Sequence, residues 1–421
     1  MLYDGALWRH VVERELFGDE DRDYAFVGFN ILPPTQKALL RGLKGRVGKE
    51  RIHFYWDYDP ALAKAQGIDA LFYDACEYIR EYQKLFPNEL EDGWSLTDNQ
   101  PEVTFIKCDT ANAQAHYVPA WLEGKGLRTS AVVLADEALM PQVLTTMPDV
   151  DLNITMGYPL NNTPIPGLIR ALIDLQANGR RKYYKEKVQS HPLYCYLAGW
   201  EWDRMVEQTG AAMLAYLRET IRVILSQMPV QLLNAQHSTL NAQLQQPSTL
   251  LYEEALFRCH EAIGRIEQQG IDDCALACRL LDKVLRTVSV PFHGEPLMGL
   301  QVMGVLETRS LDFDDVLLLT AQDGILPRAA NVSSLVPYCL REPFGLSTEK
   351  EQVNVYAYNF FRLLRRARTV TLMFPTAGSR MSQGEMSRFM RQLLAETELP
   401  IRDCRLDFRF SPDHTPSLEY A

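Results

Sequence analysis

The chain has 421 residues, of which 47% are hydrophobic and 23% are charged, as is ordinary for a globular protein with room for two or three domains. It contains no run of 18 apolar residues, which argues against a membrane-spanning segment. The net charge of −11 weighs against a protein that binds nucleic acid over its whole surface, so any such binding requires a local basic patch.

Two further features favour a cytoplasmic protein. The first residues, MLYDGALWRHVVERELF, carry acidic side chains and lack the apolar core of an export signal. The eight cysteines are scattered, and only Cys274 and Cys278 lie within one helical turn, with no second pair to complete a zinc site. We therefore expect reduced thiols.

Strand-like and helix-like runs alternate over the first part of the chain. Residues 24–32 are an apolar run, residues 33–43 begin with two prolines and continue with helical spacing, and residues 51–58 are rich in aromatics. A further strand is predicted over 103–109, and residues 131–180 repeat the alternation. Because these runs are too apolar for a sheet with one exposed face, they predict a mainly parallel sheet covered on both faces.

The pattern changes between residues 184 and 287. Apolar side chains recur there three and four residues apart, which predicts amphipathic helices and no strands. Strand-like runs return after residue 288 and include DVLLLT and TVTLMF, on either side of a helix predicted around 349–367. The predicted fold class is therefore α/β, with an all-α insert at 184–287 inside the second of two α/β parts.

A nucleotide site would require a glycine-rich loop before a helix, with a lysine that reaches the phosphates. The nearest stretch, GLKGRVGKE at 42–50, lacks the required spacing and has Glu50 in place of the hydroxyl residue. It also follows a predicted helix instead of preceding one. We interpret it as a basic turn, so the chain contains no P-loop.

Two acidic pairs follow predicted strands. Asp136 and Glu137 lie where many ATPases hold magnesium and water, although acidic residues also cap the starts of helices. Without a P-loop, capping is the better interpretation. Asp57 and Asp59 form a D-x-D sequence that can hold a divalent metal against a nucleotide-sugar, or that can simply end a strand before Pro60.

The densest basic cluster lies in FFRLLRRARTVTLMF, residues 360–374. Apolar positions would bury one face of a helix, and the arginines would project from its end towards the next strand. An arginine there can contact phosphate through two hydrogen bonds or stabilise phosphoryl charge, with solvated ion pairing as the alternative. The arginines are Arg362, Arg365, Arg366 and Arg368.

These stretches resemble motifs of superfamily I DNA helicases. GVLETRSLDFDDVLLLTAQDGILP resembles motif V, with Leu311-Asp312-Phe313 in place of a leucine–glutamate–phenylalanine signature. FFRLLRRARTVTLMF resembles motif VI, where Arg366 falls on the arginine that reaches the γ-phosphate. AVVLADEALM falls at motif IV, and residues 24–60 fall where motifs II and III would be. The chain is thus similar to the B subunit of AddAB-type helicase–nucleases and to Bacteroidetes proteins that join an inactivated helicase region to a PD-(D/E)XK nuclease.

Several positions depart from the helicase motifs. Val27 aligns with the magnesium-binding acid of motif II, and Ala135 aligns with the arginine of motif IV. In motif V, Ser310 and Leu306 replace the glycine and the histidine. The resemblance therefore implies an inactivated ATPase, because phosphoryl transfer needs these polar groups. No PD-(D/E)XK pattern occurs either, so the P-loop region and the nuclease domain are expected in other parts of a longer parent protein.

The resemblance implies RecA-like (P-loop NTPase-type) parallel sheets. Residues 1–110 would be the remainder of a first RecA-like domain, and residues 111–183 with 288–421 would form a second, interrupted by 184–287. The expected function is that of a catalytically inactive helicase-like module of a DNA repair or recombination helicase–nuclease. It would bind or guide single-stranded DNA without ATP or magnesium, and a helicase–nuclease partner subunit is an expected neighbour.

Thr308 and Arg309 are the candidates for contacts with the DNA backbone, and Trp56 and Tyr58 are the candidates for stacking on bases. Two other functions stay open. One is an ATP-dependent DNA helicase whose P-loop lies upstream, and the other is a nucleotide-sugar-using α/β enzyme that holds a metal through its D-x-D sequence. The remnants of a nucleotide site would be Asp312, Arg366, Asp136 and Glu137.

Overall fold

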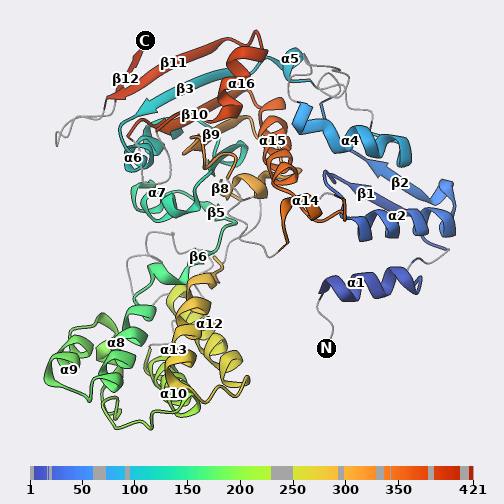
Figure 1. Cartoon of the computed structure of the whole chain (residues 1–421). Coiled ribbons are helices and arrows are strands. Elements are labelled where there is room, and N and C mark those ends of the chain that lie inside the picture. The colour runs from blue at the N-terminus through green and yellow to red at the C-terminus, as the bar shows by residue number, and fades with distance from the viewer. Residues whose placement is uncertain are drawn as a thin grey trace. The chain divides into compact units, whose positions relative to one another are not determined.

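The computed structural model describes residues 4–16, 18, 21–59, 73–90, 95–228, 250–292, 298–328, 336–341, 343–377, 384–407 and 417–420. The chain divides into two compact units (Figure 1). Unit 1 comprises Met1–Met147 and Leu300–Ala421, and unit 2 comprises Pro148–Gly299. In the described part of the chain, no helix is both long and apolar enough to cross a membrane.

A small parallel sheet lies near the start of unit 1. Strand β1 (Tyr24–Val27) pairs with β2 (Ile52–Tyr55), and helix α2 (Pro34–Val47) lies between them in the sequence. Alternate residues of β2 are buried, because one face of the strand packs into an aromatic core with α2 and α4 (Tyr73–Leu85). Helix α1 (Asp4–Glu13) precedes this sheet.

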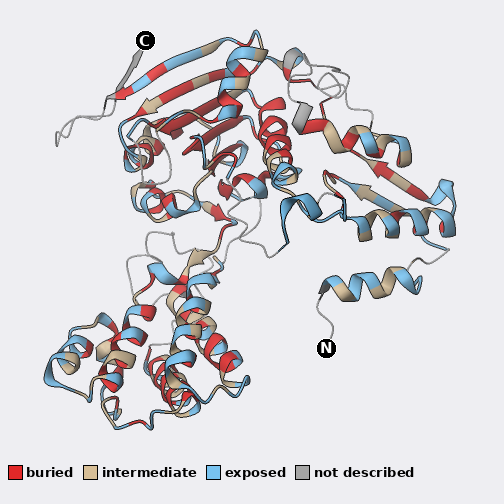
Figure 2. Ribbon diagram, viewed as in Figure 1, coloured by how far each residue is buried: buried red, intermediate tan, exposed pale blue. Residues whose placement is uncertain are grey.

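A large sheet of unit 1 contains parallel strands in the order β11, β3, β10, β9, β4 and β8, with β12 antiparallel to β11. All residues of β4, β8 and β9 are buried (Figure 2). The unbroken apolar runs of the sequence predicted this burial, because they are typical of a sheet that is covered on both faces. The strands are β3 (Glu102–Cys108), β4 (Ser130–Leu134), β8 (Leu300–Gly304), β9 (Asp315–Leu319), β10 (Thr369–Pro375), β11 (Ile401–Asp407) and β12 (Ser417–Tyr420).

Helices cover the two faces of the large sheet. On one face, α15 and α16 pack together through Phe360 and Phe389, whose ring centroids are 5.4 Å apart. On the other face, α6 holds Trp121, whose Nε1 donates to Thr371 Oγ1 of β10 at 3.2 Å. The helices are α6 (Ala111–Leu122), α7 (Met140–Thr146), α15 (Glu349–Arg365) and α16 (Arg388–Glu396). Shorter helical segments of unit 1 are η1 (Lys49–Arg51), α5 (Leu96–Asn99), η2 (Leu127–Thr129), η3 (Glu137–Leu139), η7 (Val305–Thr308) and α14 (Tyr338–Arg341).

Unit 2 is mainly helical. Leu172, Leu217 and Leu281 come from three different helices and meet in one core. Strand β6 (Tyr158–Pro159) pairs antiparallel with β7 (Ser289–Val290). The other elements are β5 (Leu152–Ile154), η4 (Leu160–Asn162), α8 (Ile165–Ala177), α9 (Lys182–Gln189), η5 (Pro192–Leu197), α10 (Gly210–Gln227), α12 (Leu250–Glu267) and α13 (Cys274–Thr287).

The α/β class, the RecA-like parallel sheet and the helical insert are confirmed, whereas two boundaries differ from expectation. Strand β3 pairs with β10 and β11, so residues 102–108 belong to the large sheet and not with β1 and β2. Helix α8 contributes to the core of unit 2, so the insert begins before residue 184. Apolar spacing predicts the type of an element, but the core that it joins depends on residues far along the chain.

Candidate functional site

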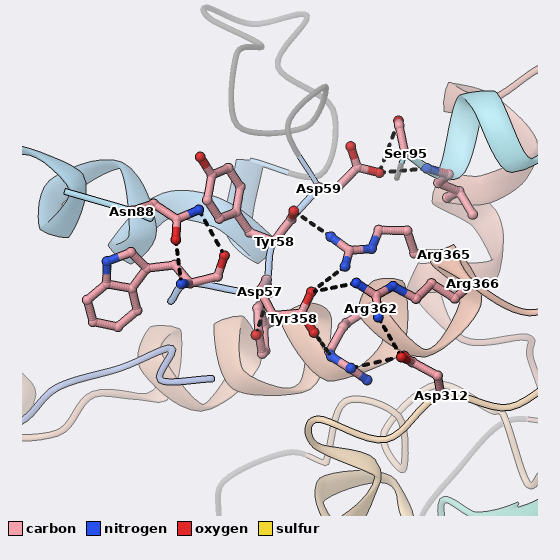
Figure 3. Close-up of polar contacts among 12 residues, drawn as sticks. Asp57, Tyr58, Asp59, Asn88, Ser95, Asp312, Tyr358, Arg362, Arg365 and Arg366 are labelled. Atoms are coloured by element: carbon pink, nitrogen blue, oxygen red, sulfur yellow. Dashed lines mark hydrogen bonds and ion pairs between the residues drawn. The ribbon is translucent and has the colours of Figure 1, made fainter. Parts of the chain in front are cut away.

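Asp57 lies two residues beyond the end of β2, at the carboxyl edge of the small sheet, where ligands bind in open α/β sheets. Trp56 anchors this strand end, because its ring is fully buried and its Nε1 donates to the Phe86 carbonyl at 2.8 Å. The Asn88 side chain also bonds to the N–H and the carbonyl of Trp56. The Asp57 side chain is 11% exposed and points towards α15 (Figure 3).

Three side chains of α15 converge on Asp57. Tyr358, Arg362 and Arg365 are spaced four and three residues apart, which places them along one side of the helix. Tyr358 Oη donates to the Asp57 carbonyl at 2.6 Å, Arg362 Nε donates to Oδ2 at 2.5 Å, and Arg365 Nη2 donates to Oδ1. Arg365 also donates to the Tyr58 carbonyl. These bonds tie the end of β2 to α15.

A second carboxylate joins these groups from the loop between η7 and β9. Asp312 accepts from Arg362 Nη2 at 3.0 Å and from Arg366 Nη1 at 2.6 Å. Arg366 follows the last residue of α15, and its Nη2 lies 3.9 Å from Asp57 Oδ1. We call this set the arginine–aspartate cluster, and it joins three guanidinium groups to two carboxylates. Its members are Asp57, Asp312, Arg362, Arg365 and Arg366.

The charges of the cluster interact strongly because most of it is shielded from solvent. The side chains of Arg362 and Arg365 are 4% and 1% exposed. Burial by itself raises the pKa of Asp57, but the guanidinium groups of Arg362, Arg365 and Arg366 outweigh it and hold the pKa below the ordinary value of 3.8. Asp57 is therefore ionised at neutral pH and is a permanent counter-ion for the arginines.

The described residues leave no space for a phosphate group beside the two buried arginines, Arg362 and Arg365. The adjoining cavity has a volume of about 10 Å³, and its walls include Tyr58, Cys76, Tyr358 and Phe361. A cavity of that size holds one water molecule at most. Arg362 and Arg365, which line this cavity, therefore act as ion-pair partners within the protein, whereas the Arg366 side chain is 28% exposed.

The two aspartates of the D-x-D sequence face different partners. Asp59 accepts from the Ser95 hydroxyl at 3.2 Å and from the Leu96 N–H at 2.8 Å, at the start of α5, whereas Asp57 faces the arginines (Figure 3). Among the residues that the structure describes, no group of three or more His, Cys, Asp or Glu side chains could hold a metal ion. The geometry gives no support to shared metal ligation by Asp57 and Asp59.

Asp136 and Glu137 follow β4, as the sequence predicted. Asp136 is the N-cap residue of η3, and its Oδ1 accepts from the Ala138 N–H at 3.1 Å. The capping interpretation is therefore confirmed for Asp136. Partial burial and the nearby Glu307 carboxylate raise the pKa of Glu137.

Two of the predicted DNA contacts are wrong. Thr308 is 1% exposed, and its hydroxyl donates to the Val305 carbonyl at 2.7 Å. Trp56 has no exposed surface, and its ring stacks on that of Phe54 with centroids 5.9 Å apart. A side chain without accessible surface can neither contact a DNA strand nor stack on a base. The sequence shows an aromatic residue at a strand end, but it does not show that the ring turns into the core.

The other two candidates, Arg309 and Tyr58, stay predictions. Arg309 is exposed after η7, and the next residue, Ser310, has a left-handed φ of 61° that turns the chain sharply. Tyr58 is half-buried, and its backbone carbonyl accepts from the cluster. The fourth arginine of the basic stretch, Arg368, pairs with Asp315 at 3.0 Å.

The partnership between Asp57 and α15 was not predicted, because a D-x-D sequence after a strand indicates a metal ligand or the end of a strand. One signal could have revealed it. Tyr358, Arg362 and Arg365 form a polar stripe on a helix whose residues 357–365 are all buried. Arginines in a buried stripe need a carboxylate partner, and a strand-end aspartate is a natural source.

A comparison with known proteins found no matching family model and no matching curated protein. The fold, the arginine–aspartate cluster and the exposed residues around the motif-like stretches are therefore the basis for a functional proposal.

Proposed function

We propose that this chain is a helicase-like module of a DNA repair or recombination helicase–nuclease, which holds or guides single-stranded DNA and does not hydrolyse nucleotide. It would act in the cytoplasm together with a nuclease domain. The arginine–aspartate cluster is the observation that carries this proposal, because it engages the arginines of the motif VI-like stretch.

The cluster argues against nucleotide turnover. An arginine stabilises a transferring phosphoryl group only if its guanidinium group can reach the phosphate. Here Arg362 and Arg365 bind Asp57, and Arg366 binds Asp312. Breaking the buried pairs of Asp57 by removing one partner costs about 3–5 kcal/mol. The pair between Arg366 and Asp312, whose side chains are 28% and 40% exposed, is weaker.

The DNA part of the proposal has two supports. Residues 304–327 and 360–374 resemble helicase motifs V and VI in the order in which helicases carry them. Arg309, in the first of these stretches, is exposed at a sharp turn. Arginines in such positions bind phosphates without reading sequence, and that binding weakens as salt displaces the contacts.

Fluorescence anisotropy of a labelled oligo-dT strand, titrated with the chain at low and moderate salt, tests the proposal. We expect salt-sensitive binding that Arg309→Glu weakens by about tenfold, because the substitution replaces a phosphate contact with a repulsive charge. Arg128→Glu is the matched control. Arg128 is an exposed arginine just before β4, whereas Arg309 follows β8. Because β4 and β8 are parallel neighbours, Arg128 lies at the amino ends of the strands and Arg309 lies at their carboxyl ends.

The control should bind as the wild type does, and circular dichroism should show that both variants are folded. Two results would contradict the proposal. One is the absence of any binding at low salt. The other is an equal loss of affinity in the two variants, which would show that only the overall charge of the chain matters.

A further inference from the structure

Unit 2 carries a basic surface segment that lies outside the motif-like stretches. Residues 180–187, RRKYYKEK, contain five cationic side chains and one acidic side chain, in a chain whose net charge is −11. Within α9, which spans most of this segment, the only buried residue is Val188, so the helix presents most of its surface to solvent. A local excess of positive charge on an acidic protein marks a surface for a polyanion.

Three of the five cations fasten the segment to the rest of unit 2. Lys185 pairs with Asp203 at 2.6 Å, and Lys187 pairs with Asp174 at 2.8 Å. Arg180 Nη1 donates to the Asp203 carbonyl at 2.9 Å. These contacts hold α9 and the turn before it in a defined position, so the remaining side chains project from a fixed support.

The other two cations, Arg181 and Lys182, are exposed at the start of α9. Arg181 has no ion-pair partner among the described residues. The Lys182 side chain is 90% exposed, and its ion pair with Glu186 is 3.7 Å long. An exposed pair of this kind is screened by water and salt and contributes little, so Lys182 can exchange it for a phosphate.

An exposed aromatic ring follows these two cations. Tyr183 is 69% exposed, which is unusual for a large aromatic side chain. Its ring meets the ring of Tyr184 edge to face, with centroids 5.2 Å apart, and Tyr184 packs against the core of unit 2. Tyr183 is therefore supported from within the protein while much of its ring stays open to solvent.

We infer that Arg181, Lys182 and Tyr183 form a contact for single-stranded nucleic acid, in which the two cations bind neighbouring phosphates and the tyrosine ring stacks on an unpaired base. Stacking on an aromatic ring and contact with phosphates need no particular base, so the contact tolerates any sequence. A duplex suits it less well, because the bases of a duplex are already stacked on one another. The inference rests on the proposed function and adds a second contact surface, on the helical unit.

The experiment compares two double charge reversals in the full chain, with a labelled oligo-dT strand as the probe. Arg181→Glu with Lys182→Glu removes the two cations from α9. Arg279→Glu with Lys283→Glu is the matched control, because these residues are exposed on α13 of the same unit and the change in charge is identical. Log affinity falls as log salt rises, and each phosphate contact makes this slope steeper. If the contact exists, the slope becomes less steep by about 1.4 in the α9 variant and stays unchanged in the control.

The aromatic part of the contact has its own pair of variants. Tyr183→Ala should weaken binding by at least about fivefold, whereas Tyr183→Phe, which keeps the ring, should bind as the wild type does. Both substitutions change an exposed side chain, so the fold should persist, and circular dichroism checks this.

Three results would overturn the inference. If the wild type binds the oligonucleotide but the α9 and α13 variants lose equal affinity, the α9 contact is wrong while the proposed function stands. Equal binding by Tyr183→Ala and the wild type would remove the stacking role and so the preference for an unpaired strand. If the wild type binds no oligonucleotide at low salt, both the proposed function and this contact are wrong.

Discussion

Asp57 is the residue that most constrains the arginines of α15. Its carboxylate binds two guanidinium groups that are almost fully buried, whereas its companion Asp312 is 40% exposed. A buried ion pair adds little net stability when it is compared with well-packed apolar residues, yet losing one partner leaves an uncompensated charge. Asp57 therefore matters chiefly because its loss would leave Arg362 and Arg365 buried without their counter-ion.

Asp57→Asn should lower the free energy of unfolding by about 3 kcal/mol, because an amide cannot neutralise the two buried guanidinium groups. Urea denaturation at neutral pH measures this change. Asp403→Asn is the control, since Asp403 pairs with Lys107 at 2.5 Å between side chains that are 43% and 35% exposed. That exposed pair should contribute less than about 1 kcal/mol, and equal losses in the two variants would contradict the role assigned to Asp57.

The lowered pKa of Asp57 also predicts how this stabilisation depends on pH. Because the pKa in the folded state lies below 3.8, the stabilisation is fully present above pH 3.8 and is lost as the pH falls through the folded-state value. The difference in unfolding free energy between the wild type and Asp57→Asn should therefore stay constant between about pH 5 and 7 and shrink in more acidic solution. A difference that grows on acidification would show that another group is responsible.

At the scale of elements, the start of α10 illustrates a contact that only glycine permits. The Gly210 N–H donates to the Asp272 carbonyl at 2.8 Å, and a β-carbon on Gly210 would lie 2.0 Å from the Ile271 carbonyl oxygen. The loop before α13 thus passes directly against the first turn of α10. A methyl group here would force backbone atoms apart.

Gly210→Ala should therefore destabilise the protein by about 1–3 kcal/mol, as overpacking in a close contact does. Gly45→Ala makes the same chemical change inside α2, where nothing lies within 4 Å of the added carbon. It should stabilise the protein by about 0.5–1 kcal/mol, because alanine favours the helix more than glycine does. Denaturation curves of the two variants should thus shift in opposite directions, and a shift in the same direction would be inconsistent with this packing.

Local sequence signals predicted individual elements well. The helix expected around 349–367 is α15, which begins after Thr348 with a capping box completed by Glu351, and the strand expected over 103–109 is β3. Local signals could indicate that the arginines of α15 need a carboxylate, but they could not identify Asp57 as that partner, because Asp57 and Arg362 are 305 residues apart in the sequence. They also could not show that Trp56 faces the core.

At the scale of the whole molecule, the sequence predicted the order α/β, helical, α/β but not where the helical unit begins. The apolar run in α8 continues the texture of the preceding α/β part, although its side chains pack in the core of unit 2. The acidic net charge likewise hid the basic segment at 180–187, in which two tyrosines follow three cations. Charge has to be considered locally as well as over the chain.

The most direct test of a DNA-guiding module without nucleotide turnover is the affinity of the full chain for single-stranded DNA with and without MgATP, measured together with phosphate release. We predict the same dissociation constant in both conditions, within about twofold, and no release of phosphate when DNA is added. A dissociation constant that MgATP changes by about tenfold, or DNA-stimulated phosphate release, would mean that nucleotide displaces Asp57 and Asp312 from the arginines and that the chain is a working motor.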